Sequence, residues 1–305
     1  MSKIFLSAGD IIDVIAPSYK PSIEFQSDII SKITQITEDM GFKARIANDI
    51  FNYKQDIFCS NSVLYRKDKF VEALLNPYSK MIWCMQGGYG ASNFIAELDK
   101  LTPPKHKKLL VGFSDITVLH IFLNCKWGWP TIHYRNLSQL CNQNNEDVSN
   151  EEITIFKNFI TGNIKKLEYE ISLLNNINFE GESIVVGGNL TLITNSIGTN
   201  WQIQAQNKIL FIEEVDERGY AIDRMFYHLE QAGIFKDIKA LLIGDIMCNP
   251  EKNGEERYDL AINNLSSRVK FPIFKINGFG HSKKNSILPF NVKCNITNSK
   301  LEYVF

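Results

Sequence analysis

The chain has 305 residues, of which 44% are hydrophobic, and a formal net charge of -1 at pH 7. This length can form one large domain or two smaller ones. A net charge near zero provides no long-range field for nucleic acid or anionic lipid, so neither is expected as a partner. Met1–Asp10 lacks the apolar core of a signal peptide, and no stretch has the length of a membrane span. We therefore expect a cytoplasmic protein without membrane contact.

The cysteines indicate neither a metal site nor a redox motif. No two of them form a C-x-x-C pair, and no other cluster has metal-ligand spacing, so neither a metal nor a cofactor is expected. Cys84 lies in the apolar run Met81–Met85, where a buried, unreactive thiol is the usual outcome. In a reducing compartment we expect all six to be free thiols: Cys59, Cys84, Cys125, Cys141, Cys248 and Cys294.

The first half of the chain alternates between strand and helix patterns. Strands are expected over 11–18, 42–47, 81–85, 108–111 and 131–134. Helices are expected over 23–40, 62–75, 93–98, 118–123 and 151–160. This order predicts an N-terminal α/β domain over residues 1–163 with a doubly wound, flavodoxin-like parallel sheet. In such sheets ligands bind beyond the C-terminal ends of the strands.

The second half repeats the alternation and ends differently. Residues 164–181 are irregular, which favours a connection between domains. Strands are then expected over 183–186, 208–214, 240–245 and 272–276, and helices over 190–198, 220–233 and 258–269. The tail over 286–305 alternates like antiparallel strands. We therefore predict that residues 164–305 comprise this linker and a C-terminal α/β domain with a β-rich end.

The stretch Gly112-Phe113-Ser114-Asp115-Ile116-Thr117 joins an expected strand to an expected helix. Serine nucleophiles of α/β enzymes sit on such sharp turns, where the hydroxyl is exposed and backbone N–H groups face a developing oxyanion. The pattern here is G-x-S-D, whereas the hydrolase elbow reads G-x-S-x-G. Ser114 is therefore a candidate nucleophile. The alternative is that Ser114 or Asp115 caps the helix.

A second turn, Gln86-Gly87-Gly88-Tyr89-Gly90, follows the strand expected over 81–85. It lacks the full dinucleotide fingerprint and the G-K-[ST] of a P-loop, so nucleotide binding is a weak interpretation. It could be a plain tight turn that uses the conformational freedom of glycine. It could also let a substrate carbonyl approach backbone N–H groups, as an oxyanion hole requires.

A serine nucleophile needs a base, and an imidazole oriented by a carboxylate serves best. Of the five histidines, His281 follows Gly278 and Gly280 in a loop beyond an expected strand, where catalytic groups concentrate. Glu213 ends an apolar strand, where a carboxylate is costly without a partner. His281 and Glu213 are therefore the candidate base and acid.

Several motifs occur in an order that resembles one family of serine peptidases. They are I-A-P-S at 15–18, G-G-Y-G at 87–90, G-F-S-D-I-T at 112–117, G-G-N-L at 187–190, L-F-I-E at 210–213, I-D-R-M at 222–225 and G-H at 280–281. Together they resemble the LD-carboxypeptidase family (S66), which includes muropeptide carboxypeptidases and microcin C immunity peptidases. The resemblance covers nearly the whole chain.

This resemblance implies roles for particular residues. It implies a triad of Ser114 as nucleophile, Glu213 as carboxylate and His281 as base. It implies an oxyanion hole from the backbone N–H groups of Gly88 and Asp115. Gly87 and Tyr89, in the glycine turn, are expected to contact the substrate.

The resemblance also implies a substrate and an assembly state. The expected reaction is removal of the terminal D-alanine from a murein tetrapeptide in cell-wall recycling, by a homodimer. Alternatives are endopeptidase action on cross-linked muropeptides, hydrolysis of a peptidyl-nucleotide antibiotic, or a non-catalytic protein that binds a small ligand. The chain departs from the family pattern at Gln86 and at His133-Tyr134-Arg135-Asn136, which affects the expected substrate selection and not the triad.

Overall fold

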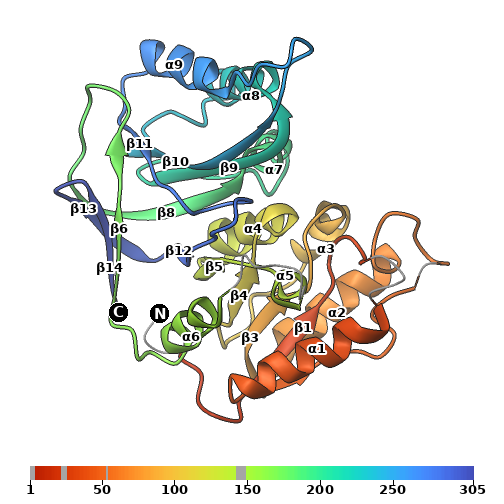
Figure 1. The fold of residues 1–305 in the computed structure, drawn as a ribbon. Coiled ribbons are helices and arrows are strands. Elements are labelled where there is room, and N and C mark those ends of the chain that lie inside the picture. The colour runs from red at the N-terminus through yellow and green to blue at the C-terminus, as the bar shows by residue number, and fades with distance from the viewer. Residues whose placement is uncertain (1–3, 22–25, 53, 142–148) are drawn as a thin grey trace.

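The computed structural model describes residues 4–21, 26–52, 54–141 and 149–305. It contains two β-sheets with helices packed on them, and the second sheet lies above the first in Figure 1. The mixed α/β architecture predicted from the sequence is confirmed.

The first sheet has the strand order β12-β5-β4-β3-β1-β2. Five strands come from the first half and are parallel: β1 (Ile11–Ile15), β2 (Lys43–Arg45), β3 (Ser79–Cys84), β4 (Leu109–Gly112) and β5 (Thr131–His133). Their order is that of flavodoxin-like sheets, and the winding direction reverses between β1 and β3. β12 (Leu288–Phe290) comes from the second half and pairs antiparallel with β5.

Helices cover this sheet, and three of their ends are fixed by capping residues. They are α1 (Gln26–Asp39), α2 (Val63–Leu75), α3 (Ile95–Leu98), α4 (Thr117–Trp127), α5 (Leu137–Cys141) and α6 (Asn150–Ile160), with short 3-10 turns over Ala91–Phe94 and Ser114–Ile116. Ser62 and Ser149 cap α2 and α6 by accepting a backbone N–H with their hydroxyls, and left-handed Gly128 ends α4. The expected helix start at Ile23 lies outside the described residues.

The second sheet has the order β6-β14-β13-β8-β9-β10-β11-β7. Its parallel centre consists of β8 (Gly181–Asn189), β9 (Ile209–Arg218), β10 (Ala240–Asn249) and β11 (Ile273–Lys275). The remaining strands, all antiparallel to their neighbours, are β6 (Lys166–Glu170), β7 (Ser172–Leu173), β13 (Lys293–Thr297) and β14 (Lys300–Val304). The helices are α7 (Leu190–Asn195), α8 (Gly219–Gln231) and α9 (Tyr258–Arg268).

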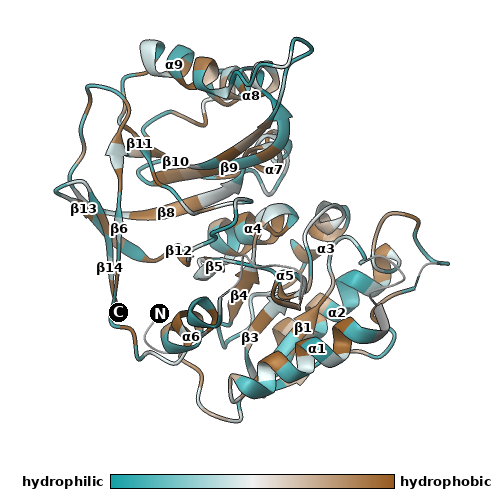
Figure 2. Ribbon diagram, viewed as in Figure 1, coloured by the Kyte–Doolittle hydropathy of each residue, from teal (hydrophilic) through white to brown (hydrophobic). Residues whose placement is uncertain are grey.

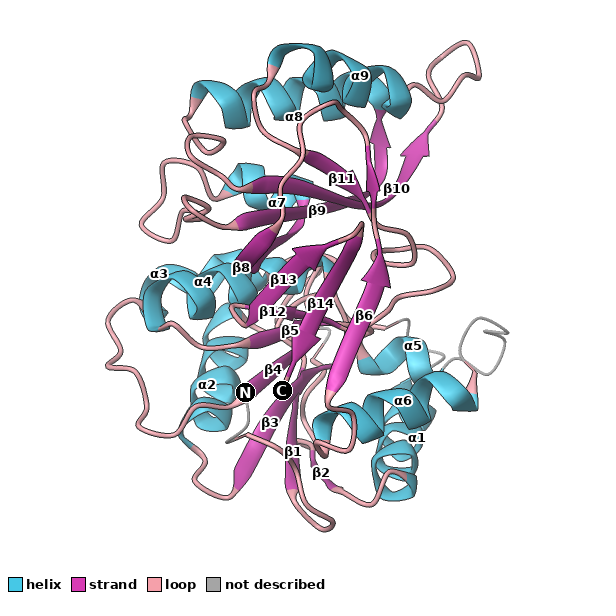
Figure 3. Ribbon diagram, turned by 90° about the vertical axis from the view of Figure 1, so that its left-hand side faces the viewer, coloured by secondary structure: helices cyan, strands magenta, loops and turns pink. Residues whose placement is uncertain are grey.

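The prediction that residues 164–181 are irregular is wrong for most of the first half of this stretch. β6 and β7 lie there, at opposite edges of the second sheet, and Figure 3 shows β6 running alongside β14. The register is supported by charge pairs, since Lys166 contacts Glu302 across the two strands and Lys300 contacts Glu168. These partners are more than 130 positions apart in the sequence, so no local pattern revealed them.

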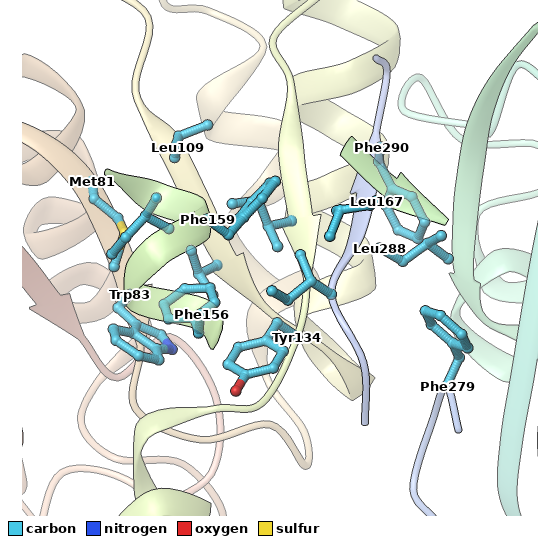
Figure 4. Close-up of a cluster of buried hydrophobic side chains, with 14 of the residues drawn as sticks. Met81, Trp83, Leu109, Tyr134, Phe156, Phe159, Leu167, Phe279, Leu288 and Phe290 are labelled. Carbon is cyan, nitrogen blue, oxygen red and sulfur yellow. The ribbon is translucent and has the colours of Figure 1, made fainter. Parts of the chain in front are cut away.

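The two sheets share two clusters of buried apolar side chains. The strands that contribute to them are largely hydrophobic (Figure 2). One cluster includes Trp83 of β3, Phe211 of β9 and Leu288 of β12, so it extends from one sheet to the other. Figure 4 shows part of it, where the ring of Tyr134 stacks on that of Phe156 with centroids 4.3 Å apart. β12 is thus a strand of the second half of the chain that belongs to the first sheet. The expected division into two domains after residue 163 stays a prediction.

Candidate active site

Ser114 lies directly after β4 in a strained turn. Its φ is +64°, a left-handed conformation that costs a non-glycine residue about 1–2 kcal/mol. Such strain is concentrated at functional sites. The helix-cap interpretation is wrong, because neither the 3-10 turn at Ser114 nor α4 has a side-chain cap. The turn therefore presents a partly exposed hydroxyl and leaves helix N–H groups available.

The glycine turn lies beside Ser114 because β3 and β4 are neighbours in the sheet. A Cβ added at Gly87 would lie 2.8 Å from Ser114 Cβ and 3.1 Å from its Oγ, so only glycine permits this approach. Gly88 is exposed and has a φ of +101°. Within the described part of the chain its N–H donates no hydrogen bond, so it is free to meet a substrate oxygen.

Asp115 links the Ser114 turn to the segments that follow β1 and the glycine turn. Its buried carboxylate accepts hydrogen bonds from the Ser18 hydroxyl (2.6 Å) and the Ala91 N–H (2.8 Å). Burial raises the pKa of Asp115, while these two hydrogen bonds act in the opposite direction. The backbone N–H of Asp115 stands in the first turn of a helix, where such groups lack intrahelical partners.

His281 and Glu213 form the second part of the site. His281 Nδ1 lies 2.6 Å from Glu213 Oε2, a distance at which Nδ1–H donates to the carboxylate. Glu213 is fully buried in β9, and Gly280 allows the close approach, since a Cβ there would lie 3.0 Å from Glu213 Oε2. Burial lowers the pKa of His281, but the charge and hydrogen bond of Glu213 outweigh it and raise the pKa above its usual value.

Contacts at the start of α4 bring the two parts together. The Thr117 hydroxyl accepts the N–H of Asn189 at 2.9 Å, and Asn189 pairs with Glu213 in the β8–β9 register. The ring of Phe113, next to Ser114, lies 4.7 Å from that of His281 between centroids. α4 itself lies between the two sheets (Figure 1). The structure therefore assembles Ser114, Gly88, Glu213 and His281 in one region.

The loop that carries His281 is held by a carboxylate that the sequence analysis did not single out. Asp245, at the end of the apolar part of β10, accepts the N–H groups of Gly278 (3.2 Å) and Phe279 (2.9 Å) and the hydroxyl of Ser282. The signal was present, because Asp245 follows an apolar strand as Glu213 does.

The positions that depart from the family pattern lie behind this loop. The fully buried Arg135 pairs with Glu152 at 2.7 Å and donates to the backbone oxygen of Lys283, two residues after His281. His133 is fully buried among aromatic rings, and burial lowers its pKa well below the usual value. Arg135 therefore supports the loop from inside, while His133 packs in the aromatic core beneath Phe113. Gln86 is partly exposed beside the glycine turn.

The cysteine and metal-binding side chains of the described residues form no second site. Cys84 is fully buried, and burial raises its pKa, so its thiol is unreactive as expected. Across residues 4–21, 26–52, 54–141 and 149–305, no group of three or more His, Cys, Asp or Glu residues could hold a metal ion. No helix in these ranges is long and apolar enough to cross a membrane.

Comparisons with known proteins show which family the chain resembles. Residues 12–134 match the model of the LD-carboxypeptidase N-terminal domain, and residues 182–296 match that of the C-terminal domain. A Rickettsia conorii protein with the provisional name of carboxypeptidase is 33% identical over 85% of this chain and 81% of its own. The Bacillus subtilis protein named "Probable murein peptide carboxypeptidase" is 30% identical over 81% of this chain and 76% of its own.

A solved structure extends the likeness to the whole fold. The crystal structure of muramoyltetrapeptide carboxypeptidase from Oxalobacter formigenes superposes with a TM-score of 0.79 and 25% identity, covering 96% of this chain and 97% of that one. The family resemblance inferred from the motifs is confirmed.

Proposed function

The chain belongs to the LD-carboxypeptidase family, and from this premise we propose that it is a cytoplasmic serine carboxypeptidase of murein recycling. Its reaction is hydrolysis of the bond before the terminal D-alanine of a murein tetrapeptide. The observation that carries the proposal is the Glu213–His281 hydrogen bond beside the strained Ser114 turn. The names of the Bacillus subtilis and Oxalobacter formigenes proteins support the choice of substrate.

The geometry supplies the parts of an acyl transfer. With Nδ1–H donated to Glu213, His281 keeps Nε2 free to take the proton of the Ser114 hydroxyl as Oγ attacks the scissile carbonyl. The carboxylate stabilises the imidazolium that forms. The N–H groups of Gly88 and Asp115 meet the oxyanion, and His281 then gives its proton to the leaving amine. Water then attacks the acyl-enzyme while His281 takes its proton, and the proton passes to Ser114 Oγ as the ester bond breaks and the tripeptide leaves with a new carboxylate.

Three further features belong to the proposal. Gly87 and Tyr89, in the glycine turn, contact the substrate, and the protein acts as a homodimer; both follow from the family resemblance. The reaction needs no metal, because the sequence contains no cluster of residues with metal-ligand spacing.

The test is mass spectrometry of the products formed from a defined murein tetrapeptide. Wild type should release D-alanine and leave a tripeptide. Ser114→Ala should remain folded and lose at least a thousandfold in activity, because only the nucleophilic oxygen is removed. Cross-linked dimers and peptidyl nucleotides, offered in parallel, identify the alternative substrates. Full activity of a folded Ser114→Ala protein would eliminate the mechanism.

A further inference from the structure

Four large apolar side chains are exposed beside the glycine turn. Tyr19, Phe58 and Tyr89 are 43%, 56% and 50% exposed, and Ile57 is 78% exposed. The rings of Phe58 and Tyr89 meet edge to face with centroids 6.2 Å apart. We call these four residues the aromatic rim. A contiguous apolar patch of this kind on a protein surface generally marks a binding site.

The aromatic rim is fixed to the glycine turn. The Tyr19 N–H donates to the Gly87 oxygen at 3.1 Å, and a Cβ at Gly88 would lie 2.6 Å from Tyr19 Cβ. The Cys59 thiol donates to the Tyr89 oxygen. The carboxylate of Asp56 accepts the N–H groups of Phe58 and Cys59 at 2.8 and 2.9 Å. Rings held in place before binding lose little conformational entropy when a ligand arrives.

The position of the aromatic rim in the fold indicates that a substrate occupies it. Tyr19 follows β1 and Tyr89 follows β3, so both stand at the point where the winding direction reverses, the usual ligand position in open α/β sheets. Gly87 touches Ser114 and Gly88 touches Tyr19. Since consecutive Cα atoms are about 3.8 Å apart, the rim begins within one or two substrate residues of the nucleophile.

We propose that the aromatic rim binds the side chain of diaminopimelate, the third residue of the tetrapeptide, whose carbonyl is attacked. Its methylene stem packs on Tyr19 and Phe58, its terminal ammonium group lies over the rings, and its terminal carboxylate points to solvent. This inference rests on the proposed function. A long side chain with an apolar stem and a charged end packs well on apolar surface, and aromatic faces attract ammonium groups. The leaving D-alanine offers these rings only a methyl group, with neither a methylene stem nor an ammonium group to place on them.

The experiment compares kcat/KM for two tetrapeptides that have diaminopimelate or alanine as the third residue. Wild type should prefer diaminopimelate by at least tenfold, since each methylene in an apolar site contributes strongly to discrimination. Phe58→Ala and Tyr19→Ala should reduce that preference at least threefold, mainly through KM. The matched control is Tyr78→Ala, which removes a more exposed tyrosine at the opposite end of β3 and should behave as wild type.

An unchanged preference in both rim variants would overturn the inference. So would a sedimentation experiment in which Phe58→Ala converts a dimer to a monomer and keeps the preference, because the rim would then be a subunit contact. If wild type cleaves neither peptide, the proposed function fails separately. Calorimetric titration of Ser114→Ala with the diaminopimelate peptide then decides: binding that Phe58→Ala weakens supports the rim, and no binding refutes it.

Discussion

Replacing Glu213 by Gln should lower kcat by about 10³–10⁴. His281 becomes a cation during attack, and a carboxylate about 4 Å from that charge contributes about 4 kcal/mol at an effective dielectric constant near 20, or three powers of ten in rate. An amide can also favour the wrong imidazole tautomer, which costs about 10⁴ in a serine protease triad. Shape is retained, so the loss reports the charge.

The neighbouring Glu214 provides a matched control. It is also buried, but its carboxylate accepts the Asn189 side-chain amide at 2.9 Å and the N–H of Thr191 at 2.7 Å. Burial is the main cause that raises the pKa of Glu214, whereas these hydrogen bonds act against it. Glu214→Gln should therefore reduce the free energy of unfolding by about 1–3 kcal/mol, because the glutamine amide has only one oxygen to accept the hydrogen bonds that the two carboxylate oxygens accept. Its kcat should stay within tenfold of wild type.

Both variants are measured by D-alanine release at saturating tetrapeptide and by urea denaturation. The reasoning requires that Glu213→Gln loses activity with modest change in stability, and that Glu214→Gln does the reverse. If Glu214→Gln is inactive and Glu213→Gln active, the hydrogen-bonded pair is not the catalytic one.

Two further predictions concern the same loop. Glu213 raises the pKa of His281 in spite of burial. Protonation of His281 removes the base, so kcat/KM should fall as the pH is lowered, with a midpoint above pH 6.5. A midpoint below pH 6.5 contradicts the pairing. Asp245→Ala frees two backbone N–H groups near His281 and should lower kcat/KM about 10- to 100-fold, with a smaller loss in Asp245→Asn, which keeps one acceptor. Equal, wild-type rates in both Asp245 variants would show that the loop needs no such support.

The strand-to-turn junctions could be predicted because their signals are local. The apolar run before Gly87, and that before Gly112, must end where glycine permits the chain to turn. A carboxylate that closes an apolar strand needs a partner, which singled out Glu213, and a histidine that follows two loop glycines singled out His281. These inferences require only neighbouring residues and the cost of burying a charge.

What the sequence did not reveal depends on partners far along the chain. β6 pairs with β14, and β12 pairs with β5. Each of these strands therefore finds its hydrogen-bonding partner only when distant parts of the chain come together. The same holds for Arg135, whose role appears only when the backbone oxygen of Lys283 lies beside it. Exposed rings at Tyr19 and Phe58 gave no sequence signal, because surface exposure is a property of the fold.

The site needs two chain halves held in a fixed relation, and polar contacts across the junction provide that precision. The Thr117 hydroxyl receives the Asn189 N–H, and the same asparagine is held by Glu214, next to Glu213 in β9. A shift of either sheet would therefore break a buried hydrogen bond before it separated Ser114 from His281. Losing this hydrogen bond costs more free energy than sliding apolar side chains past one another, since a buried polar group without a partner retains its full desolvation penalty. The geometry at Ser114 is thus determined by contacts that never touch the substrate.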